Sequence, residues 1–368
     1  MVFIPIIATI VLVIWRARQL EPQGIAPLTS LRGFAAAMVF ALHFSENYRA
    51  DHPDDRLASF LSGGYESVSV FFVLSGFLLT IAIRRDLRAQ EFNLRQYFVR
   101  RAARIYPLYY VLLAITFLLS PQIVHWQNVL LIHAFFNSAV FQGIPPAWTL
   151  TIEESFYVLL PPAIWLCLKI GQSNGLVIWC LGLLGAGFFL VALHIPDFVI
   201  SLQFMWSRTI FGRFPIFAIG VACAFLYEQR KQWPLSMLIV FIIALLSATC
   251  LSVLETLGLD FQLGDILVGL AAGGVILGLA SDNRLTRFLG NRYFVYLGLI
   301  SYALYLIHLS ALMIWMLPLV HNVPDLIAAY AVATLLSIAC YELIERPARA
   351  AILRRFGHNA ALSPVTPV

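Results

Sequence analysis

Charged residues are scarce in this sequence: they make up 12% of 368 residues, whereas 61% are hydrophobic. A water-soluble domain of this size cannot bury so large an apolar fraction. The composition therefore excludes a soluble enzyme and a nucleic-acid-binding module, although the net charge is +5. It is the composition of a chain that lies in a membrane.

Repeats, low-complexity stretches and metal-binding cysteine motifs are also missing, which predicts one continuous domain without a metal site. The cysteines all fall in apolar runs and are expected to be packing residues; they are Cys167, Cys180, Cys223, Cys250 and Cys340. Residues 3–15 are apolar, but no cationic segment precedes them and "WRAR" follows without a small-residue cleavage site. An uncleaved membrane span is expected there, not a signal peptide.

Long apolar runs without alternation are what the sequence does contain, and they predict transmembrane helices. The runs lie near residues 2–15, 28–45, 67–83, 105–120, 127–142, 150–170, 176–194, 205–226, 234–253, 263–281, 293–317 and 324–345. The run at 127–142 carries His133 and Asn137 and is expected to be re-entrant or interfacial. The predicted fold is therefore all-α: a polytopic membrane bundle of about 10–11 transmembrane helices.

Loop charges orient the chain, because positively charged loops face the cytoplasm. Residues 84–104 hold seven arginines and two acids, whereas 46–66 hold five acids and two arginines. If 127–142 does not cross the membrane, the later basic loops also fall inside. The N-terminus is then expected outside and the C-terminus in the cytoplasm.

The stretch "LTSLRGFAAAMVFALHF" places Arg32 and His43 in one apolar run. Eleven residues at 100° each are three turns plus about 20°, so the two share a helix face about 16 Å apart. Ionisable residues inside a membrane are functional candidates. The alternative is a snorkelling arginine and a packing histidine, and Arg32 at a cytoplasmic helix end needs no further explanation.

Two further motifs lie near mid-membrane and at the cytoplasmic side, respectively. In "FFVLSGFLL", Ser75 and Gly76 allow a ligand or another helix to approach closely. In "RRAARIYPLYY", Arg101 and Arg104 share a face, and Pro107 is expected just inside the helix start. Clustered arginines suit a polyphosphate ligand, with topology alone or anionic-lipid binding as the alternative.

The stretch "PPAWTLTIEESFYVLLPP" puts Trp148 and then Glu153 and Glu154 at the mouth of an apolar helix. Glutamates favour a helix N-terminus, and Thr149 or Thr151 would cap it, which is the purely structural interpretation. The functional interpretation is that Glu153 lies on the outer side, toward which His43 also points.

Arg213 is buried near mid-membrane in "SRTIFGRFPIFAIG", and "ISYALYLIH" aligns Ser301, Tyr305 and His308 on one face. Such a polar stripe also serves to join helices. The oriented spans nevertheless bring His43, Ser75, Glu153, Arg213 and His308 toward the middle and outer membrane, with arginines at the inner mouth. The hypothesis is a pocket reached from both faces.

Together these motifs resemble acyltransferase family 3, the bacterial integral-membrane acyltransferases, over roughly residues 28–347. The resemblance rests on the spacing from Arg32 to His43, the Ser-Gly-Phe motif, the Arg101–Arg104 pair, "WTLTIEESFYVLLP", "RFPIFAIG", "ISYALYLIH" and "IERP". Residues 1–20 look like an additional N-terminal span and 348–368 a short cytoplasmic tail. The chain resembles a stand-alone member without an appended extracytoplasmic domain.

The resemblance implies transfer of an acyl group, commonly acetyl, from cytoplasmic acyl-CoA to a hydroxyl of a sugar or cell-envelope glycan, at the bacterial inner membrane. His43 would act as general base or acyl carrier, with Glu153 orienting or charge-stabilising its imidazole. Arg101, Arg104 and Arg32 would bind the CoA phosphates. The expected pocket residues are Ser75, Trp148, Arg213, Tyr302 and His308, and Arg213, Ser75 or Tyr302 would stabilise an oxyanion.

Two other functions stay open at this point. A transporter or flippase of lipid-linked saccharides would also need buried charges and a two-sided cavity, although no inverted repeat is visible. A metal site built from His43, Glu153 and His308 would suit zinc, but these residues lack close sequence spacing, and neither a metal nor a nucleic-acid partner is expected. Acyl-CoA consumption by the purified protein separates the enzyme from the transporter.

Overall fold

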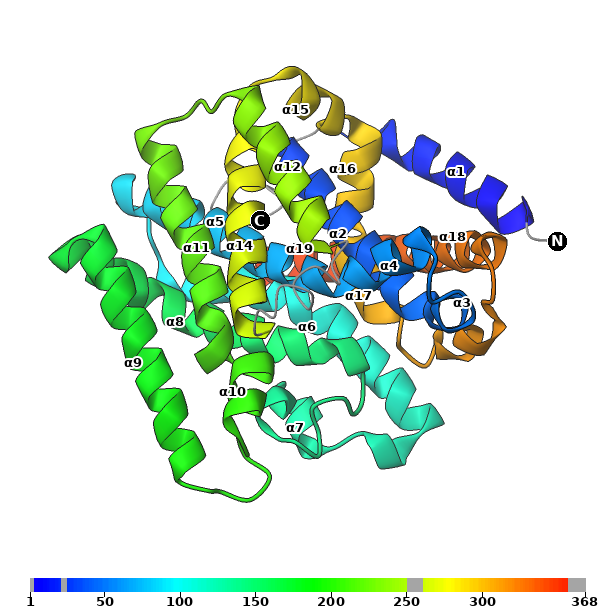
Figure 1. Ribbon diagram of the computed structural model, residues 1–368, viewed down its shortest axis with the longest axis horizontal. Coiled ribbons are helices and arrows are strands. Elements are labelled where there is room, and N and C mark those ends of the chain that lie inside the picture. Colours follow the sequence, from blue (N-terminus) through cyan, green and yellow to red (C-terminus); the bar gives the residue numbers. More distant parts are fainter. Residues whose placement is uncertain (1–2, 21–24, 250–260, 357–368) are drawn as a thin grey trace.

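The computed structural model describes residues 3–20, 25–249 and 261–356, and these residues form helices and turns with no β-strand (Figure 1). One isolated antiparallel bridge joins Phe136 and Phe198. The all-α prediction is confirmed. Cys250 and the end of the predicted tail, 357–368, lie outside the described residues.

The helices in the first half of the chain are α1 (Phe3–Ala17), α2 (Ala26–Phe44), α3 (Glu46–Asp51), α4 (Arg56–Ser62), α5 (Ser67–Arg88), α6 (Leu94–Leu119), α7 (Trp126–Val129) and α8 (Trp148–Ile170). Those that follow are α9 (Gln172–Ala192), α10 (Leu202–Arg208), α11 (Ile210–Gln229), α12 (Leu235–Thr249), α14 (Phe261–Leu279), α15 (Arg284–Leu289), α16 (Arg292–Leu299), α17 (Ser301–Ile307), α18 (Val323–Cys340) and α19 (Arg346–Phe356). A π-helical segment, Tyr341–Glu345, joins α18 to α19 without a break.

Seven helical stretches of the described residues are long and apolar enough to cross a membrane. They are Ala26–Phe44, Arg56–Arg88, Leu94–Leu119, Pro145–Ile170, Gln172–Ala192, Leu202–Gln229 and Val323–Phe356. Three shorter apolar helices, Ile4–Ala17, Leu235–Ser247 and Gly264–Leu279, bring these candidates close to the predicted 10–11.

Two predicted spans differ from continuous helices. The run at 127–142 consists of the short α7, a 3₁₀ turn at His133–Phe135 and further turns, in line with the expectation that it does not cross. The run at 293–317 is divided among α16, α17 and a 3₁₀ segment, Ile314–Leu319. Hydropathy does not register these breaks, because the broken segments remain apolar.

Helix α5 lies at the centre of the bundle and packs most extensively against α11. A Cβ on Gly76 would collide with the carbonyl oxygen of Phe217, and one on Gly220 with that of Val73. The two backbones therefore approach as closely as only glycine permits. Gly76 thus serves helix packing, while its neighbour Ser75 faces the cavity described below.

Helix α2 makes a second close crossing, against α16. A Cβ on Gly298 would overlap the carbonyl oxygen of Thr29, and one on Gly33 would lie 2.9 Å from the backbone nitrogen of Gly298. The two residues of the "RG" dipeptide, Arg32 and Gly33, therefore have different roles. Gly33 fixes the helix crossing, and Arg32 is directed to the cavity.

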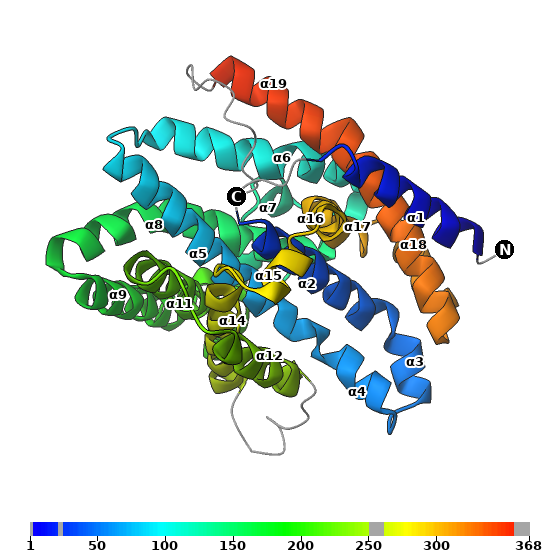
Figure 2. The same cartoon turned by 90° about the horizontal axis from the view of Figure 1, so that it is seen from above.

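The outer helices expose many large apolar side chains, as helices that face lipid do. In the peripheral α9, exposed apolar side chains include Val177, Leu181 and Phe189, whereas α5 is mostly buried from Ser67 to Thr80 (Figure 1). Figure 2 shows α1 along one edge beside α18, and α6 and α19 along the same side of the molecule. The interior of the bundle is also largely apolar, and a smaller set of buried polar residues lies within it.

Candidate functional site

A cavity of about 590 Å³, including its open mouth, lies among five helices: α2, α5, α6, α8 and α17. Its lining residues are Arg32, Val68, Phe71, Phe72, Ser75, Arg104, Ile105, Thr149, Leu150, Glu153, Ser301, Tyr302 and Tyr305. Aromatic and aliphatic walls with a few converging polar groups are typical of ligand sites. Of the predicted site residues, Arg32, Arg104, Ser75, Glu153 and Tyr302 meet here.

Glu153 is held by hydrogen bonds from two helices. Its Oε1 accepts from the Ser75 hydroxyl at 2.9 Å and from the Tyr157 hydroxyl at 2.6 Å. Arg32 lies near enough to interact with the carboxylate electrostatically. The carboxylate thus joins α5 to α8 at the cavity wall, and its two hydrogen bonds are directed to residues other than His43.

The expected threonine cap of this helix is wrong. Helix α8 begins at Trp148 after a 3₁₀ turn, Pro145–Ala147, and Ala147 at its N-cap makes no side-chain hydrogen bond. The Thr149 hydroxyl instead donates to the Pro146 carbonyl at 3.0 Å and lies 3.0 Å from the Tyr305 hydroxyl. Because the double proline starts the helix earlier, Glu153 falls within the helix and not in its first turn.

Helix α17 supplies the opposite wall and connects the cavity to His308. The Tyr305 ring lines the cavity, and the carbonyl of Tyr305 accepts a hydrogen bond from His308 Nδ1 at 2.7 Å. Tyr302 donates its hydroxyl proton to the carbonyl of Ile105 at 2.7 Å, which ties α17 to α6. Ser301 and Tyr305 therefore line the cavity, and His308 continues the same stripe just beyond it.

His43 and His308 form a pair just beyond Tyr305. His308 Nε2 lies 3.3 Å from His43 Nδ1, and the ring centroids are 5.1 Å apart. His43 Nδ1 also lies 2.9 Å from the Val39 carbonyl, one turn back along α2. His308 is fully buried and His43 partly so. The histidines adjoin the cavity through Tyr305 and are not among its lining residues.

Arginines gather at the other end of the cavity, from three helices. Arg32 on α2 interacts electrostatically with Arg101 and Arg104 on α6, and Arg349 on α19 interacts with both of the latter. Glu345, in the π-helical segment, is the acid close to Arg104 and Arg349. π-helical turns are rare in proteins, and those that occur are often found at functional sites. We call Arg32, Arg101, Arg104 and Arg349 the inner arginine cluster.

The expected position of Pro107 is wrong. Helix α6 begins at Leu94, capped by the Asn93 side chain, so Pro107 lies deep in the helix and not at its start. The arginine-rich stretch is therefore mostly helical, and the connection between α5 and α6 is only residues 89–93. These arginines therefore lie on α5 and α6 themselves and not in a loop between them.

Arg213 and Trp148 occupy a different place from the cavity. Arg213 donates from Nη1 to Asp265 Oδ2 at 2.5 Å, from Nη2 to the Tyr65 hydroxyl at 3.1 Å and from Nε to the Ser207 carbonyl. Trp148 is buried with its ring 4.8 Å from the Arg208 guanidinium. Neither residue lines the cavity, so their assignment to the pocket stays a prediction.

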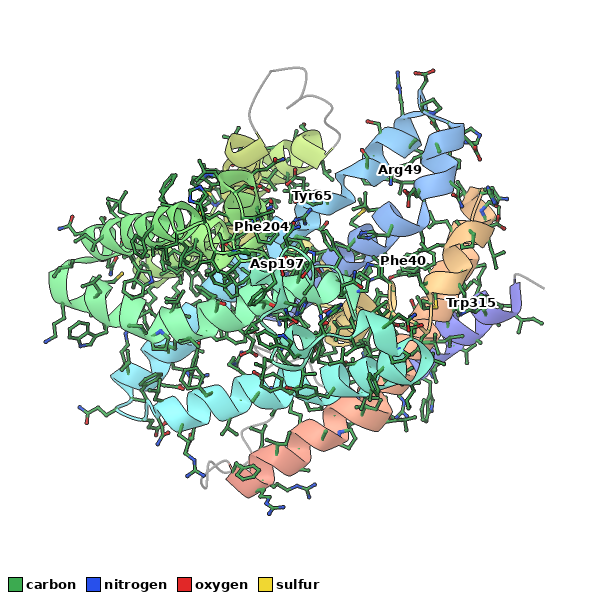
Figure 3. All side chains as sticks on the ribbon, turned by 90° about the horizontal axis from the view of Figure 1, so that it is seen from below. Phe40, Arg49, Tyr65, Asp197, Phe204 and Trp315 are labelled. Carbon is green, nitrogen blue, oxygen red and sulfur yellow. The ribbon has the colours of Figure 1, made fainter. Side chains whose placement is uncertain are left out.

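Figure 3 separates these regions. Tyr65 and Arg49 are labelled in its upper half, while the red C-terminal helix α19, which carries Arg349, lies at the bottom. The Arg213 site, marked by its partner Tyr65, is therefore remote from the C-terminal arginines. The cavity lies between helices that reach both regions, because α5 starts next to Tyr65 and Arg104 on α6 packs near α19.

Sequence reasoning missed three partners. Tyr157 lies one helical turn after Glu153, so the i, i+4 spacing was a usable signal. Asp265 is a single carboxylate in an apolar run, and a buried arginine such as Arg213 requires a partner. Arg349 had no such signal, because its approach to α6 depends on the uninterrupted continuation of α18 into α19.

The two histidines meet, but the zinc alternative gains no third ligand from them. Among the described residues no group of three or more His, Cys, Asp or Glu side chains is placed to hold a metal ion.

Known proteins resemble this chain over most of its length. A family model described as an acyltransferase domain matches residues 26–342. O-acetyltransferase OatA of Staphylococcus aureus is 25% identical over 326 residues, which covers 78% of this chain and 50% of the relative. Peptidoglycan O-acetyltransferase OatA of Listeria monocytogenes is 25% identical over 327 residues, 80% of this chain and 50% of the relative.

The chain thus spans about half the length of these curated relatives. No solved structure matches it significantly. The family match extends from the start of α2 to the π-helical segment and so includes the cavity, the histidine pair and most of the inner arginine cluster. On this match the chain belongs to acyltransferase family 3.

Proposed function

We propose that this protein is a multi-pass membrane O-acyltransferase that moves an acyl group, expected to be acetyl, from acyl-CoA to a hydroxyl of a sugar or cell-envelope glycan. One observation carries the proposal: the cavity has arginines at one end and adjoins paired histidines at the other. The names of the relatives, O-acetyltransferase and peptidoglycan O-acetyltransferase, support acetyl as the group and a glycan as the acceptor.

The inner arginine cluster is proposed to bind the donor. CoA is polyanionic, and guanidinium groups bind phosphate oxygens in bidentate fashion. Arg101 and Arg104 would hold the phosphates, with Arg32 at the cavity mouth and Arg349 as a further cation from the C-terminal helix. We place this end of the cavity at the cytoplasmic face of the bacterial inner membrane, with the N-terminus outside, because the arginine-rich stretch 84–104 lies next to it.

His43 is proposed as the chemical centre. As the acceptor oxygen bonds to the thioester carbonyl carbon, its hydroxyl proton passes to His43. The tetrahedral intermediate then expels the CoA sulfur, and the same proton passes from His43 to the departing thiolate. A positioned base of this kind contributes about 10²–10⁴-fold to the rate. In the second form of the mechanism His43 carries the acyl group covalently between the two half-reactions.

Glu153 is proposed to act on the substrate side of the cavity and not on the imidazole. Its two hydrogen bonds, from Ser75 and Tyr157, fix the carboxylate where a cavity ligand would meet it. The oxyanion donor stays open between Ser75 and Tyr302, which line the cavity, whereas Arg213 is paired with Asp265 outside it. The hydroxyls of Ser75 and Tyr302 already donate to Glu153 and the Ile105 carbonyl, so either would have to exchange partners when substrate binds.

The decisive experiment uses the purified full chain in lipid nanodiscs, with acetyl-CoA as donor and an isolated cell-wall glycan fraction as acceptor. Wild-type protein should release CoA thiol and add one acetyl mass to the glycan, and His43→Ala should abolish both while the protein folds normally. His52→Ala is the matched control, because His52 also contacts a carbonyl one turn back, at 3.0 Å to Tyr48, but is exposed.

Two outcomes would overturn the proposal. Full turnover by His43→Ala removes the base and the acyl-carrier roles together. Movement of a lipid-linked saccharide across the membrane without thioester consumption by the wild-type protein establishes the flippase instead. If the protein is an acyltransferase, mass spectrometry of envelope glycans from cells with and without the gene identifies the acceptor by a mass shift of one acyl group. If it is a flippase, the two sets of glycans show no such shift.

A further inference from the structure

The hydrogen bonds of the histidine pair fix the position of both ring protons. A carbonyl oxygen only accepts, so a ring nitrogen at hydrogen-bond distance from one must carry a hydrogen. His43 Nδ1 lies 2.9 Å from the Val39 carbonyl, and His308 Nδ1 lies 2.7 Å from the Tyr305 carbonyl. Both neutral rings are therefore Nδ1–H tautomers, as assigned from the hydrogen-bond network.

This assignment determines what each remaining nitrogen does. His308 Nε2 has a lone pair, and it faces the Nδ1–H of His43 at 3.3 Å. The His43 hydrogen is thus shared between the Val39 carbonyl and His308. His43 Nε2 is left unprotonated, which is the state that a general base needs.

We propose that His308 is a positioning residue that holds His43 in the tautomer whose Nε2 accepts the substrate proton. The inference rests on the proposed function, in which His43 is the base. His308 occupies the role that a carboxylate has in Ser-His-Asp triads, where the partner of Nδ1–H holds the tautomer and stabilises the imidazolium. Here the partner is a neutral imidazole, itself fixed by the backbone of α17.

The surroundings of His43 support a neutral partner. The charged groups that interact with His43 electrostatically are Arg49 and Glu46, both on α3. Arg49 is engaged by the Leu42 carbonyl and the Ser45 hydroxyl. Glu153 is committed to Ser75 and Tyr157. Within the described part of the chain, the side-chain acceptor at Nδ1 of His43 is His308.

The proton balance during transfer is complete. The acceptor hydroxyl gives its proton to His43 Nε2 while the new C–O bond forms, and both ring nitrogens of His43 then carry hydrogen. The hydrogen bond from His43 Nδ1–H to His308 stabilises this charged imidazolium. No proton needs to move to His308. Breaking the C–S bond returns the Nε2 proton to the thiolate.

The test compares His308→Leu with His308→Gln in nanodiscs, using acetyl-CoA and the glycan fraction. Leucine removes the acceptor, and kcat should fall about 10- to 100-fold with the KM for acetyl-CoA within about twofold, less than the whole contribution of a base. The planar amide of glutamine offers one donor to Tyr305 and one acceptor to His43, so it should recover most of kcat. His52→Leu is the surface control.

A spectroscopic measurement keeps the test independent of turnover. In protein labelled with ¹⁵N-histidine, the His43 signals, identified by their loss in His43→Ala, should report a protonated Nδ1 and an unprotonated Nε2. In His308→Leu the second tautomer should become populated, and in His308→Gln it should not. A merely structural role for His308 would lower thermal stability in both variants without moving the tautomer.

Three results would overturn the positioning role: an Nε2–H tautomer of His43 in the wild type, an unchanged tautomer in His308→Leu, or unchanged kcat in that variant. Failure of the proposed function is distinguishable, because wild-type protein would then consume no acetyl-CoA while the nitrogen signals still report the tautomer. If His308→Leu does not fold, His308→Gln and the wild-type spectrum decide the question.

Discussion

Arg213 and the inner arginine cluster differ in how their positive charge is matched. Arg213 meets one carboxylate, Asp265, at 2.5 Å, and Ser69 donates to the second oxygen of that carboxylate at 3.3 Å. The inner arginine cluster has four guanidinium groups, and the glutamates that interact with its members are Glu153, Glu154 and Glu345. The first site is balanced, and the second carries a formal excess of one positive charge.

The difference indicates what each site is for. A buried ion pair with its hydrogen bonds satisfied leaves no capacity for a ligand, and breaking it is costly. An excess of cations costs energy in a low-dielectric interior unless an anion neutralises it. The inner arginine cluster therefore fits a polyanionic donor, whereas Arg213 fits a structural role.

The largest expected effect comes from breaking the balanced pair. Arg213→Leu leaves Asp265 buried without its partner and should destabilise the protein by about 3–5 kcal/mol. The double variant Arg213→Leu with Asp265→Leu should regain most of that loss, since no charge remains buried. Thermal unfolding in detergent and the yield of monodisperse protein measure both. A stable Arg213→Leu protein that fails only in acyl transfer would instead assign Arg213 to the reaction.

The next effect concerns affinity and leaves stability nearly unchanged. Arg104 lines the cavity, and a hydrogen bond to a charged group is worth about 1.5–3 kcal/mol. Arg104→Ala should therefore raise the KM for acetyl-CoA about 10- to 100-fold. The matched control is Arg95→Ala, an exposed arginine on the same helix. An unchanged dependence on acetyl-CoA would move donor binding away from the inner arginine cluster.

A smaller effect of the same sign is expected from the C-terminal helix. Arg349 approaches Arg104 and Arg101 but does not line the cavity, so Arg349→Ala should raise the KM less, about 3- to 10-fold. Arg354→Ala, on the same helix and exposed, should leave it unchanged. Glu345→Gln should act in the opposite direction by increasing the positive excess. If Arg349→Ala and Arg354→Ala change the KM equally, Arg349 contributes no more to donor binding than an exposed arginine does.

Much of this site followed from sequence because helical periodicity projects single residues onto a face. The spacing from Arg32 to His43 and the i, i+4, i+7 stripe of Ser301, Tyr305 and His308 both predict a shared face, and the structure brings these residues to the cavity or beside it. Periodicity also explains why Ser75 faces inward next to a packing glycine. These relations are local to one helix, and a helix is rigid enough to preserve them.

Relations between helices were beyond the sequence. Glu153 was expected near His43, yet its hydrogen bonds go to Ser75 and Tyr157, because the double proline begins α8 earlier and the crossing of α5 with α8 decides the neighbours. Arg213 was expected in the pocket, and the partner that holds it, Asp265, lies far along the chain on α14. Which residues of two helices become partners depends on where the helices cross, for example at the close approach of Gly76 and Gly220. Helical periodicity does not predict these crossing points.

A last effect concerns His133, a buried group that is expected to stay neutral and that has no charged partner to match it in the part of the chain that the structure describes. His133 is fully buried outside the candidate spans, and neither ring nitrogen has a hydrogen-bond partner among the described residues. Burial lowers the pKa of His133 to about 4, below the ordinary value of 6.5. The unfolded chain therefore binds the proton more readily, so stability is fully present above about pH 6.5 and is lost as pH falls toward 4.

His133→Leu should differ little from wild type near pH 8 and be more stable by about 2 kcal/mol near pH 5. Thermal unfolding at the two pH values measures this, and a difference independent of pH would mean that burial does not lower the pKa of His133 in the folded protein.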